Sequence, residues 1–246
     1  MRGWRREIAG LVLPVACGGC GRPRTELCEE CVAVLATAPR RVRPAPEPAG
    51  LPVVHATAPY ENAVRAMLLA HKERGALGLA GALGGALAAA VRAGTGQPDR
   101  AGPLLLVPVP SARRATAARG HDPARRIAVA ASAELRRGGA EARVLTVLRQ
   151  RRAVADQAGL GARERQENLA GALIVVKGGR RLLDGGRVVL VDDLLTTGSS
   201  LAEAARAVRA AGYSWGGAGP AGSGGTAGFG AAVVAASPSA FELNRN

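Results

Sequence analysis

Two adjacent carboxylates, Asp192 and Asp193, stand between an apolar, β-branched run at residues 188–191 and a short turn rich in hydroxyl groups. The turn consists of Thr196, Thr197, Gly198, Ser199 and Ser200. Helical spacing follows at residues 201–211, with Gly212 placed as a cap, so the turn is predicted to open a helix N-terminus. Backbone amides, hydroxyl groups and the positive end of a helix dipole suit a phosphate. A carboxylate pair suits sugar hydroxyls and a hydrated divalent cation.

The elements around this segment must place the carboxylates at an open edge. The apolar run predicts a buried strand, and an apolar core would not hold two unpaired charges, so Asp192 and Asp193 are expected at the mouth of the strand. An ordinary strand-to-helix connection, in which Asp and Ser side chains only cap the helix, is the competing interpretation. A Walker-type loop is excluded because no Gly-Lys-Ser/Thr follows a glycine run, and residues 75–85 lack the G-x-G-x-x-G spacing of a dinucleotide site.

The cysteines form the second pattern with chemical meaning. They occur as two C-x-x-C pairs with seven residues between the pairs: Cys17, Cys20, Cys28 and Cys31. Four thiolates can close a tetrahedron around zinc, and the glycines beside the first pair permit a tight turn. Two disulfides or a redox-active C-x-x-C site are the competing interpretations, although a redox site of the thioredoxin kind would follow a strand. We favour a structural zinc site, because the segment has little apolar material to fold without a metal.

Length and charge limit the possible function classes. With 246 residues and 48% hydrophobic content, the chain can hold one α/β domain and a small module. A net charge of +14, almost wholly from arginine, favours polyanionic partners, although a skewed genomic base composition would also enrich arginine. Aromatic residues make up only 2% of the chain, so single-stranded nucleic acid would be bound mainly through its backbone charge.

The N-terminal residues 2–16 imitate a short signal peptide. Glu7 interrupts the basic region, and Pro14 stands where a lipoprotein cleavage site needs an aliphatic residue, so we predict a cytoplasmic protein. The uncharged run at residues 75–91 is dominated by Ala and Gly and is short for a membrane span. We expect a buried helix there and no membrane span.

Composition divides the chain into a cysteine module at residues 1–36, a Pro- and Arg-rich extended linker at residues 37–52, and a main domain at residues 53–246. Strands are predicted at residues 53–56, 104–109, 144–148, 188–191 and 231–236, and helices at residues 61–71, 77–91, 123–136 and 201–211. Their alternation predicts an α/β fold with a parallel sheet flanked by helices and ligands at the carboxyl ends of the strands. The glycine-rich residues 216–230 are expected to form a mobile loop.

The apolar strand, acid pair and Thr-Thr-Gly turn resemble the phosphoribosyl-pyrophosphate (PRPP) binding motif of type I phosphoribosyltransferases. Together with the cysteine pairs, the order of further segments resembles the ComF family, the competence-associated phosphoribosyltransferase-like proteins. These segments are Tyr60-Glu-Asn-Ala-Val-Arg65 with Lys72-Glu-Arg-Gly75, Leu106-Val-Pro-Val-Pro110 with Arg113-Arg114 and Arg119-Gly120, and Gln157-Ala-Gly-Leu160 with Arg163 to Asn168. The chain departs from the family at Arg119-Gly-His-Asp-Pro123, where Arg-Gly-Phe-Asn-Gln is usual.

The resemblance implies that Asp192 and Asp193 contact the ribose hydroxyls of PRPP, that the turn holds its 5′-phosphate, and that Mg²⁺ accompanies it. The loop after residues 104–109 is the candidate pyrophosphate loop, with Arg113 and Arg114 as forked donors, unless these are ordinary solvated arginines. Residues 149–168 are polar and long enough for a lid, although a plain surface helix and loop would look similar. The lid candidates are Arg149, Arg151, Arg152, Gln157, Arg163 and Asn168.

Two function classes follow. The resemblance and the charge favour an accessory protein of DNA uptake or DNA handling that binds PRPP and single-stranded DNA, and the resemblance implies a competence helicase as a partner. An active phosphoribosyltransferase of nucleotide salvage or biosynthesis is the alternative. No base-reading loop stands out, and His71 and His121 lack a matching carboxylate motif, so no catalytic residue is assigned.

Overall fold

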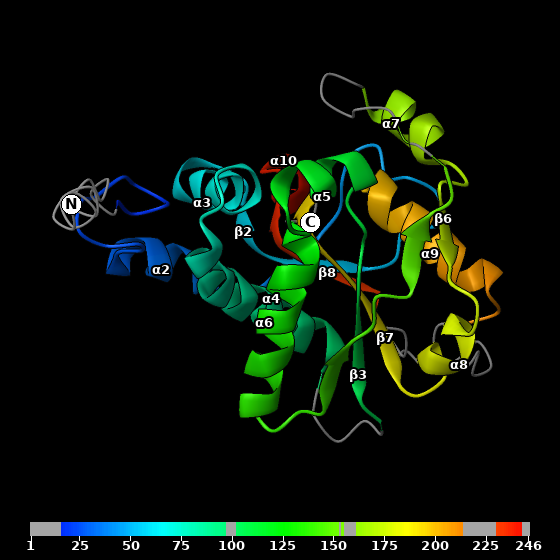
Figure 1. Ribbon diagram of the computed structural model, residues 1–246. Coiled ribbons are helices and arrows are strands. Elements are labelled where there is room, and N and C mark those ends of the chain that lie inside the picture. The colour runs from blue at the N-terminus through cyan, green and yellow to red at the C-terminus, as the bar shows by residue number, and fades with distance from the viewer. Residues whose placement is uncertain (1–15, 97–101, 153, 155–160, 214–229, 243–246) are drawn as a thin grey trace, which may run out of the picture.

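A mostly parallel sheet lies at the centre of the fold (Figure 1). The computed structural model describes residues 16–96, 102–152, 154, 161–213 and 230–242. Within these residues the sheet has six strands in the order β1-β2-β8-β7-β3-β4. Their bounds are β1 Arg40–Val42, β2 Val54–Pro59, β3 Leu104–Pro108, β4 Ala142–Val144, β7 Arg187–Leu195 and β8 Ala231–Ala236. Only β1, at one edge, runs antiparallel to its neighbour in this described sheet.

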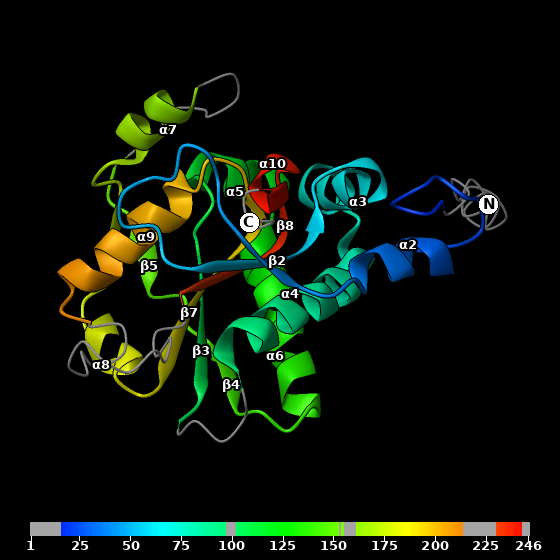
Figure 2. The ribbon, with the colours of Figure 1, turned by 180° about the vertical axis from the view of Figure 1, so that it is seen from behind.

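Helices cover both faces of the sheet (Figures 1 and 2). One face carries α2 Glu29–Leu35, α3 Asn62–Glu73, the short 3₁₀ helix η2 Leu77–Leu79, α4 Ala80–Thr95 and α6 Pro123–Arg137. The other face carries α8 Gly179–Leu183, α9 Ser199–Ala210 and α10 Ser239–Glu242. The predicted α/β fold with helices on both sides of a sheet is therefore confirmed, except that the sheet is mostly parallel and mixed, and its assignment to the phosphoribosyltransferase type stays a prediction.

A smaller strand pair stands apart from the central sheet. Strands β5 Leu148–Gln150 and β6 Leu173–Val175 pair antiparallel, and α7 Ala162–Leu169 lies between them in the chain. The predicted strand at residues 144–148 was wrong, because the chain leaves the central sheet there. Leu145 N still donates to Leu106 O of β3, whereas Val147 O accepts from Val176 N, which follows β6.

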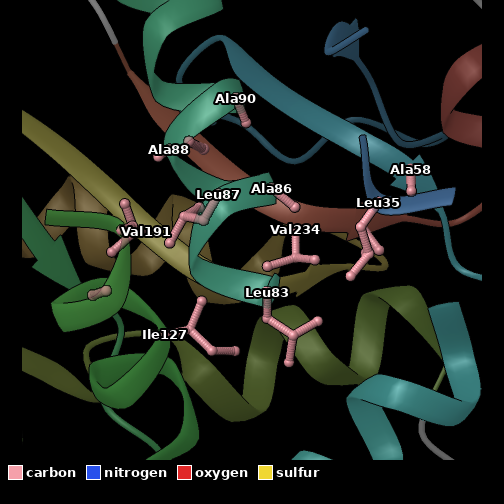
Figure 3. Packing of buried hydrophobic residues seen from close by; sticks show 14 of the residues in the cluster. Leu35, Ala58, Leu83, Ala86, Leu87, Ala88, Ala90, Ile127, Val191 and Val234 are labelled. Carbon is pink, nitrogen blue, oxygen red and sulfur yellow. The ribbon is translucent and has the colours of Figure 1, made fainter. Parts of the chain in front are cut away.

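The core is built from small and aliphatic side chains. Alternate residues of the strands divide it, so that Val191 of β7 packs towards α4 and α6 while its neighbour Leu190 packs towards α9. Figure 3 shows Leu87 of α4 beside Val191, within the cluster that also holds Ile127 of α6. Gly84 lets α4 approach α6 closely, because a Cβ there would lie 2.9 Å from the backbone nitrogen of Ala131.

The segment expected to be an extended linker contributes a strand to the sheet. Residues 40–42 form β1, whose Val42 is 1% exposed and faces the core while Arg41 points outward. Alternation over so few residues is a weak sequence signal, which explains why the strand was missed. Thr37 Oγ1 also donates to Thr57 O of β2 at 2.6 Å.

The cysteine module packs against the same helices as the central sheet. Cys17, Cys28, Cys31 and Leu35 belong to one apolar cluster with residues of α3 and α4. The module and the main fold therefore share a continuous core, although the division of the chain into domains stays a prediction.

One helix in the described part of the chain is long and apolar enough to cross a membrane, namely residues Leu77–Thr95, with a mean hydropathy of 1.4 over its best window. Its residues Leu83, Leu87 and Val91 are 0% exposed and belong to the core, as the predicted buried helix requires. The N-terminal residues 1–15 and the glycine-rich segment up to residue 229 lie outside the described residues.

Candidate functional site

Asp192 and Asp193 lie inside β7, near its carboxyl end. The strand extends beyond the predicted residues 188–191 because β8 continues beside it, with Asp192 opposite Val233 and Leu194 opposite Ala235. The acid pair therefore belongs to the hydrogen-bonded ladder instead of following it.

An ion pair explains how the sheet accommodates a buried acid. Asp193 is 7% exposed, and its Oδ2 lies 3.2 Å from Nζ of Lys72 at the end of α3. The backbone N–H of Asp193 donates to Oδ1 of Asp192 at 2.9 Å. The expectation that both carboxylates need an open edge is corrected for Asp193, because Lys72 compensates its charge.

The same arrangement perturbs the protonation of the site. Burial raises the pKa of Asp192 well above its ordinary value of 3.8, and the charge of Asp193 raises it further, while Lys72 opposes both effects. The charge of Asp193 is the main reason that the pKa of Lys72 is raised. Lys72 is therefore a cation at neutral pH, and Asp192 is a carboxyl group that gains from a proton, a metal ion or a hydroxyl donor nearby.

The turn after β7 is the candidate phosphate-binding turn. Gly198 adopts a φ of +77° and directly precedes α9. In the first backbone hydrogen bond of the helix, Ala202 N donates to Gly198 O. The backbone amides before Ala202 therefore have no hydrogen-bond partner within the helix. The hydroxyl groups of Thr197 and Ser199 lie 3.0 Å apart, while Thr196 is exposed and Ser200 is half-buried.

The segment that follows β1 packs against this turn. A Cβ at Gly198 would lie 3.1 Å from Leu51 Cδ2 and 3.2 Å from Pro48 Cγ. Arg209 of α9 donates through Nη1 to Gly50 O at 3.1 Å. In Figure 2 this segment, in blue, runs past α9. The turn is thus supported from the side of residues 48–51.

The candidate pyrophosphate loop leads into a short helix, and its role stays a prediction. After β3, Val109 N still donates to Val191 O of β7 at 2.9 Å, and a short helix, α5 Arg113–Arg119, follows. Arg114 is exposed on α5, and the side chain of Arg113 lies outside the described part of the structure. The structure places this segment beside β7 but does not bring the described Arg114 side chain into the acid pair's hydrogen bonds.

An ion pair joins the end of α5 to the end of α3. Arg119 donates through Nε and Nη2 to both carboxylate oxygens of Glu73, at 2.8 and 2.7 Å. His121 Nε2 lies 3.2 Å from the carbonyl oxygen of His71, a residue that is 0% exposed. Lys72 stands between these two anchored residues, so its backbone position is fixed from both sides.

The lid candidates fall into different environments. Arg149 and Arg151 are exposed at β5 and just after it. Arg152 Nη2 donates to Asn168 O and Ala170 O, at 2.8 and 2.9 Å, so this guanidinium holds the end of α7. Gln157 lies outside the described residues.

Helix α7 also reaches the turn. Arg163 pairs with Glu167 at 2.9 Å on the exposed side of the helix. Arg165 Nη1 lies 3.5 Å from Thr196 Oγ1, a long hydrogen bond between the lid candidate segment and the candidate phosphate turn. The structure therefore brings one arginine of this segment to the site, and it assigns Arg152 and Arg163 to local contacts.

The cysteine sulfur atoms form a compact cluster. All four thiols are free, and their sulfur atoms lie within 4.8 Å of one another. The distances from Cys28 Sγ are 3.7 Å to Cys17 and 3.5 Å to Cys20. Tetrahedral zinc with bonds of about 2.3 Å separates its sulfur ligands by roughly 3.8 Å, so these four cysteines can hold a metal ion.

The backbone prepares the cysteine cluster for a metal. Gly21 has a φ of +78° and donates its N–H to Cys17 O, and a Cβ at Gly19 would lie 2.6 Å from Cys31 Sγ. Burial opposes ionisation of Cys17, but amides at Cys20, Cys28 and Gly19 outweigh it and lower the pKa of Cys17 to about 6. A thiolate at Cys17 suits zinc, whereas the pKa of Cys28 is raised, and burial and the neighbouring thiols raise the pKa of Cys31.

Lys72 and Glu203 are the site residues that sequence reasoning missed. Lys72 stands in a segment that carried the family resemblance, but nothing local indicates that its partner is Asp193. Glu203 is a buried carboxylate in α9 that accepts from Leu173 N, and its only sequence signal is an acid within an apolar helical face.

A scan against models of protein families and a search of the curated proteins found no match to this chain.

Proposed function

We propose that this protein binds PRPP at the carboxyl end of β7 and is a phosphoribosyltransferase-like protein of the ComF type. One observation carries the proposal: Asp192 and Asp193 lie near the carboxyl end of a central strand, and a short turn joins this strand to a helix N-terminus that Gly198 precedes. A ligand that combines ribose hydroxyls with a 5′-phosphate matches both halves of this arrangement.

Each half has a separate task in this proposal. The unpaired amides at the start of α9 and the hydroxyl groups of Thr197 and Ser199 would receive the 5′-phosphate. The carboxylates of Asp192 and Asp193 would accept hydrogen bonds from the ribose hydroxyls. Arg165, which lies beside Thr196, would add positive charge at the phosphate.

Mg²⁺ would bind together with PRPP, because the oxygen ligands proposed for it suit this ion. Carboxylate and diphosphate oxygens are the ligands that Mg²⁺ prefers, and Asp192 is a carboxyl group whose ionisation a nearby cation would favour. When bound, Mg²⁺ would neutralise part of the diphosphate charge. The residues that would hold it are Asp192 and Asp193.

We assign the cysteine site to structural zinc. Four sulfur donors, three of them buried, make a closed site without a place for a substrate. Three of the cysteines and Leu35 pack in one cluster with residues of α3 and α4, so zinc would stabilise that part of the fold.

Single-stranded DNA is the proposed macromolecular partner. The net charge of +14 supports it, as do the exposed side chains of Arg149 in β5 and Arg151 just after it. A competence helicase as partner and a role in DNA uptake rest on the resemblance alone and stay predictions.

Two titrations test this proposal. Calorimetry with PRPP and Mg²⁺ should show binding, and pyrophosphate release should stay at background when single nucleobases are added.

Affinity for an oligothymidylate should fall linearly with salt on logarithmic axes, and replacing Arg149 and Arg151 with Ala should reduce the slope by about 0.7 for each lost phosphate contact. An Arg137→Ala variant, which removes an arginine paired with Glu134 on α6, is the control. Pyrophosphate release with one nucleobase, and no DNA binding at low salt, would instead establish an active phosphoribosyltransferase.

A further inference from the structure

Lys72 places a cation inside the proposed PRPP site. Its Nζ lies 3.2 Å from Oδ2 of Asp193, and the two residues are 121 positions apart in the chain. The side chain of Lys72 is 35% exposed, whereas that of Asp193 is 9% exposed. The side chain of Lys72 is therefore the more accessible partner of this ion pair.

The fold holds Lys72 in place without a ligand. Its neighbour Glu73 forms two hydrogen bonds with Arg119, and the carbonyl oxygen of its other neighbour, His71, is 3.2 Å from Nε2 of His121. Lys72 thus belongs to a helix end that is anchored on both sides.

A ligand that carries phosphate groups meets an electrostatic obstacle at two adjacent carboxylates. A divalent cation can remove the repulsion, but Lys72 already offsets one negative charge at the point where the ligand would approach. An acid pair with an internal counter-ion can accept sugar hydroxyls from an anionic ligand at a smaller electrostatic cost than an uncompensated pair.

We propose that Lys72, acting through Asp193, is the positioning residue that allows the acid pair to receive an anionic sugar phosphate when no divalent metal is bound. This inference rests on the proposed function, and it concerns the metal dependence of that same site. The ligand class is a ribose phosphate, either with the diphosphate, as in PRPP, or without it, as in ribose 5-phosphate.

The test is calorimetric titration of the full-length protein with PRPP and with ribose 5-phosphate, each in EDTA and in Mg²⁺. Lys72→Met should weaken binding in EDTA roughly tenfold or more, as expected for the loss of a charge-assisted contact, and should weaken it less in Mg²⁺. Lys72→Arg should retain most of the affinity in EDTA. The chain offers a matched control in Lys177→Met, because Lys177 is exposed and is the only other lysine in the sequence.

A second cycle tests whether Lys72 acts through Asp193. In an Asp193→Asn background, Lys72→Met should cost little affinity in EDTA, whereas an undiminished loss there would show direct contact with the ligand and overturn the inference. Circular dichroism checks the fold of each variant, and Lys72→Gln replaces Lys72→Met if the latter does not fold. Equal affinity of Lys72→Met and the parent in EDTA also overturns the inference. A parent that binds PRPP in neither buffer removes the proposed function itself, which separates the two failures.

Discussion

The carboxylate of Glu203 in α9 accepts a hydrogen bond from the backbone N–H of Leu173 in β6, at 2.9 Å. The same carboxylate pairs with Arg206, whose Nη2 donates to Leu173 O at 2.9 Å. This contact fastens the β5–β6 pair, which carries part of the lid candidate segment, to the helix whose first turn is the candidate phosphate site. It therefore fixes one end of that segment to the site.

Removing the Glu203 carboxylate should destabilise the protein. Glu203→Ala leaves the Leu173 amide without its acceptor and removes the carboxylate partner of Arg206, so the free energy of unfolding should fall by about 2 kcal/mol in urea denaturation. Glu167→Ala is the control, because Glu167 forms an exposed pair with Arg163 and its loss should change stability by less than about 0.5 kcal/mol. Equal effects of the two substitutions would show that the Glu203 contact contributes little.

The same residue should give the stability a recognisable pH dependence. Burial alone would raise the pKa of Glu203, but hydrogen bonds from Arg206 and Leu173 outweigh it and hold the pKa below the ordinary value of 4.5. A carboxyl group with a lowered folded pKa stabilises the fold above its unfolded pKa and loses that contribution as the pH falls through its folded pKa. Urea denaturation should therefore show a larger loss of stability below about pH 4.5 in the parent than in Glu203→Gln. Parallel pH profiles of the two proteins would contradict this assignment.

Gly198 should be intolerant of a side chain. Its φ of +77° strains any L-residue, and a new Cβ would crowd Leu51 and Pro48 at 3.1 and 3.2 Å. Gly198→Ala should lower the free energy of unfolding by about 1–2 kcal/mol in thermal or urea denaturation. Gly85→Ala is a matched control within α4, where a Cβ meets nothing within 4 Å, and it should stabilise the protein by up to about 1 kcal/mol. Similar changes in both variants would contradict a special role for the turn.

The cysteine cluster should contain zinc. Purified protein should carry about one zinc per chain, and Cys17→Ser or Cys28→Ser should release it, because three remaining thiolates do not complete the structural site. Because these cysteines pack on the core beside α3 and α4, metal loss should make the residues around the cluster sensitive to protease and should also lower the melting temperature. Elemental analysis and limited proteolysis measure both effects. Full metal retention in both variants would reject the assignment.

Local patterns allowed much of this arrangement to be predicted. The spacing of Cys17 to Cys31 predicted a cluster that the fold does bring together, because a turn at the first pair and the start of α2 at the second bring all four sulfur atoms close to one another. The turn at Gly198 was predicted to open α9 for a similar reason, since its hydroxyl groups, glycine and helix follow one another directly in the chain.

Contacts between distant segments could not be predicted in this way. Nothing in the residues around Asp193 indicates that Lys72 would reach it, and the sequence therefore suggested an acid that had to remain at an open edge. Arg152 is a second example. The sequence suggested it as a lid residue, whereas in the structure its guanidinium donates to carbonyl groups at the end of α7. Strand β1 escaped prediction because three residues give too short an alternation.

The most direct test of the account is calorimetric titration of PRPP, with Mg²⁺, into the parent protein and into a variant carrying both Asp192→Asn and Asp193→Asn. The parent should bind PRPP, and the affinity of the variant should be at least roughly tenfold lower, because two ionic acceptors for the ribose hydroxyls and the metal are lost. Circular dichroism and a urea denaturation curve establish that the variant is folded. Unchanged affinity in a folded variant, or a parent that does not bind PRPP, would contradict the assignment of this site.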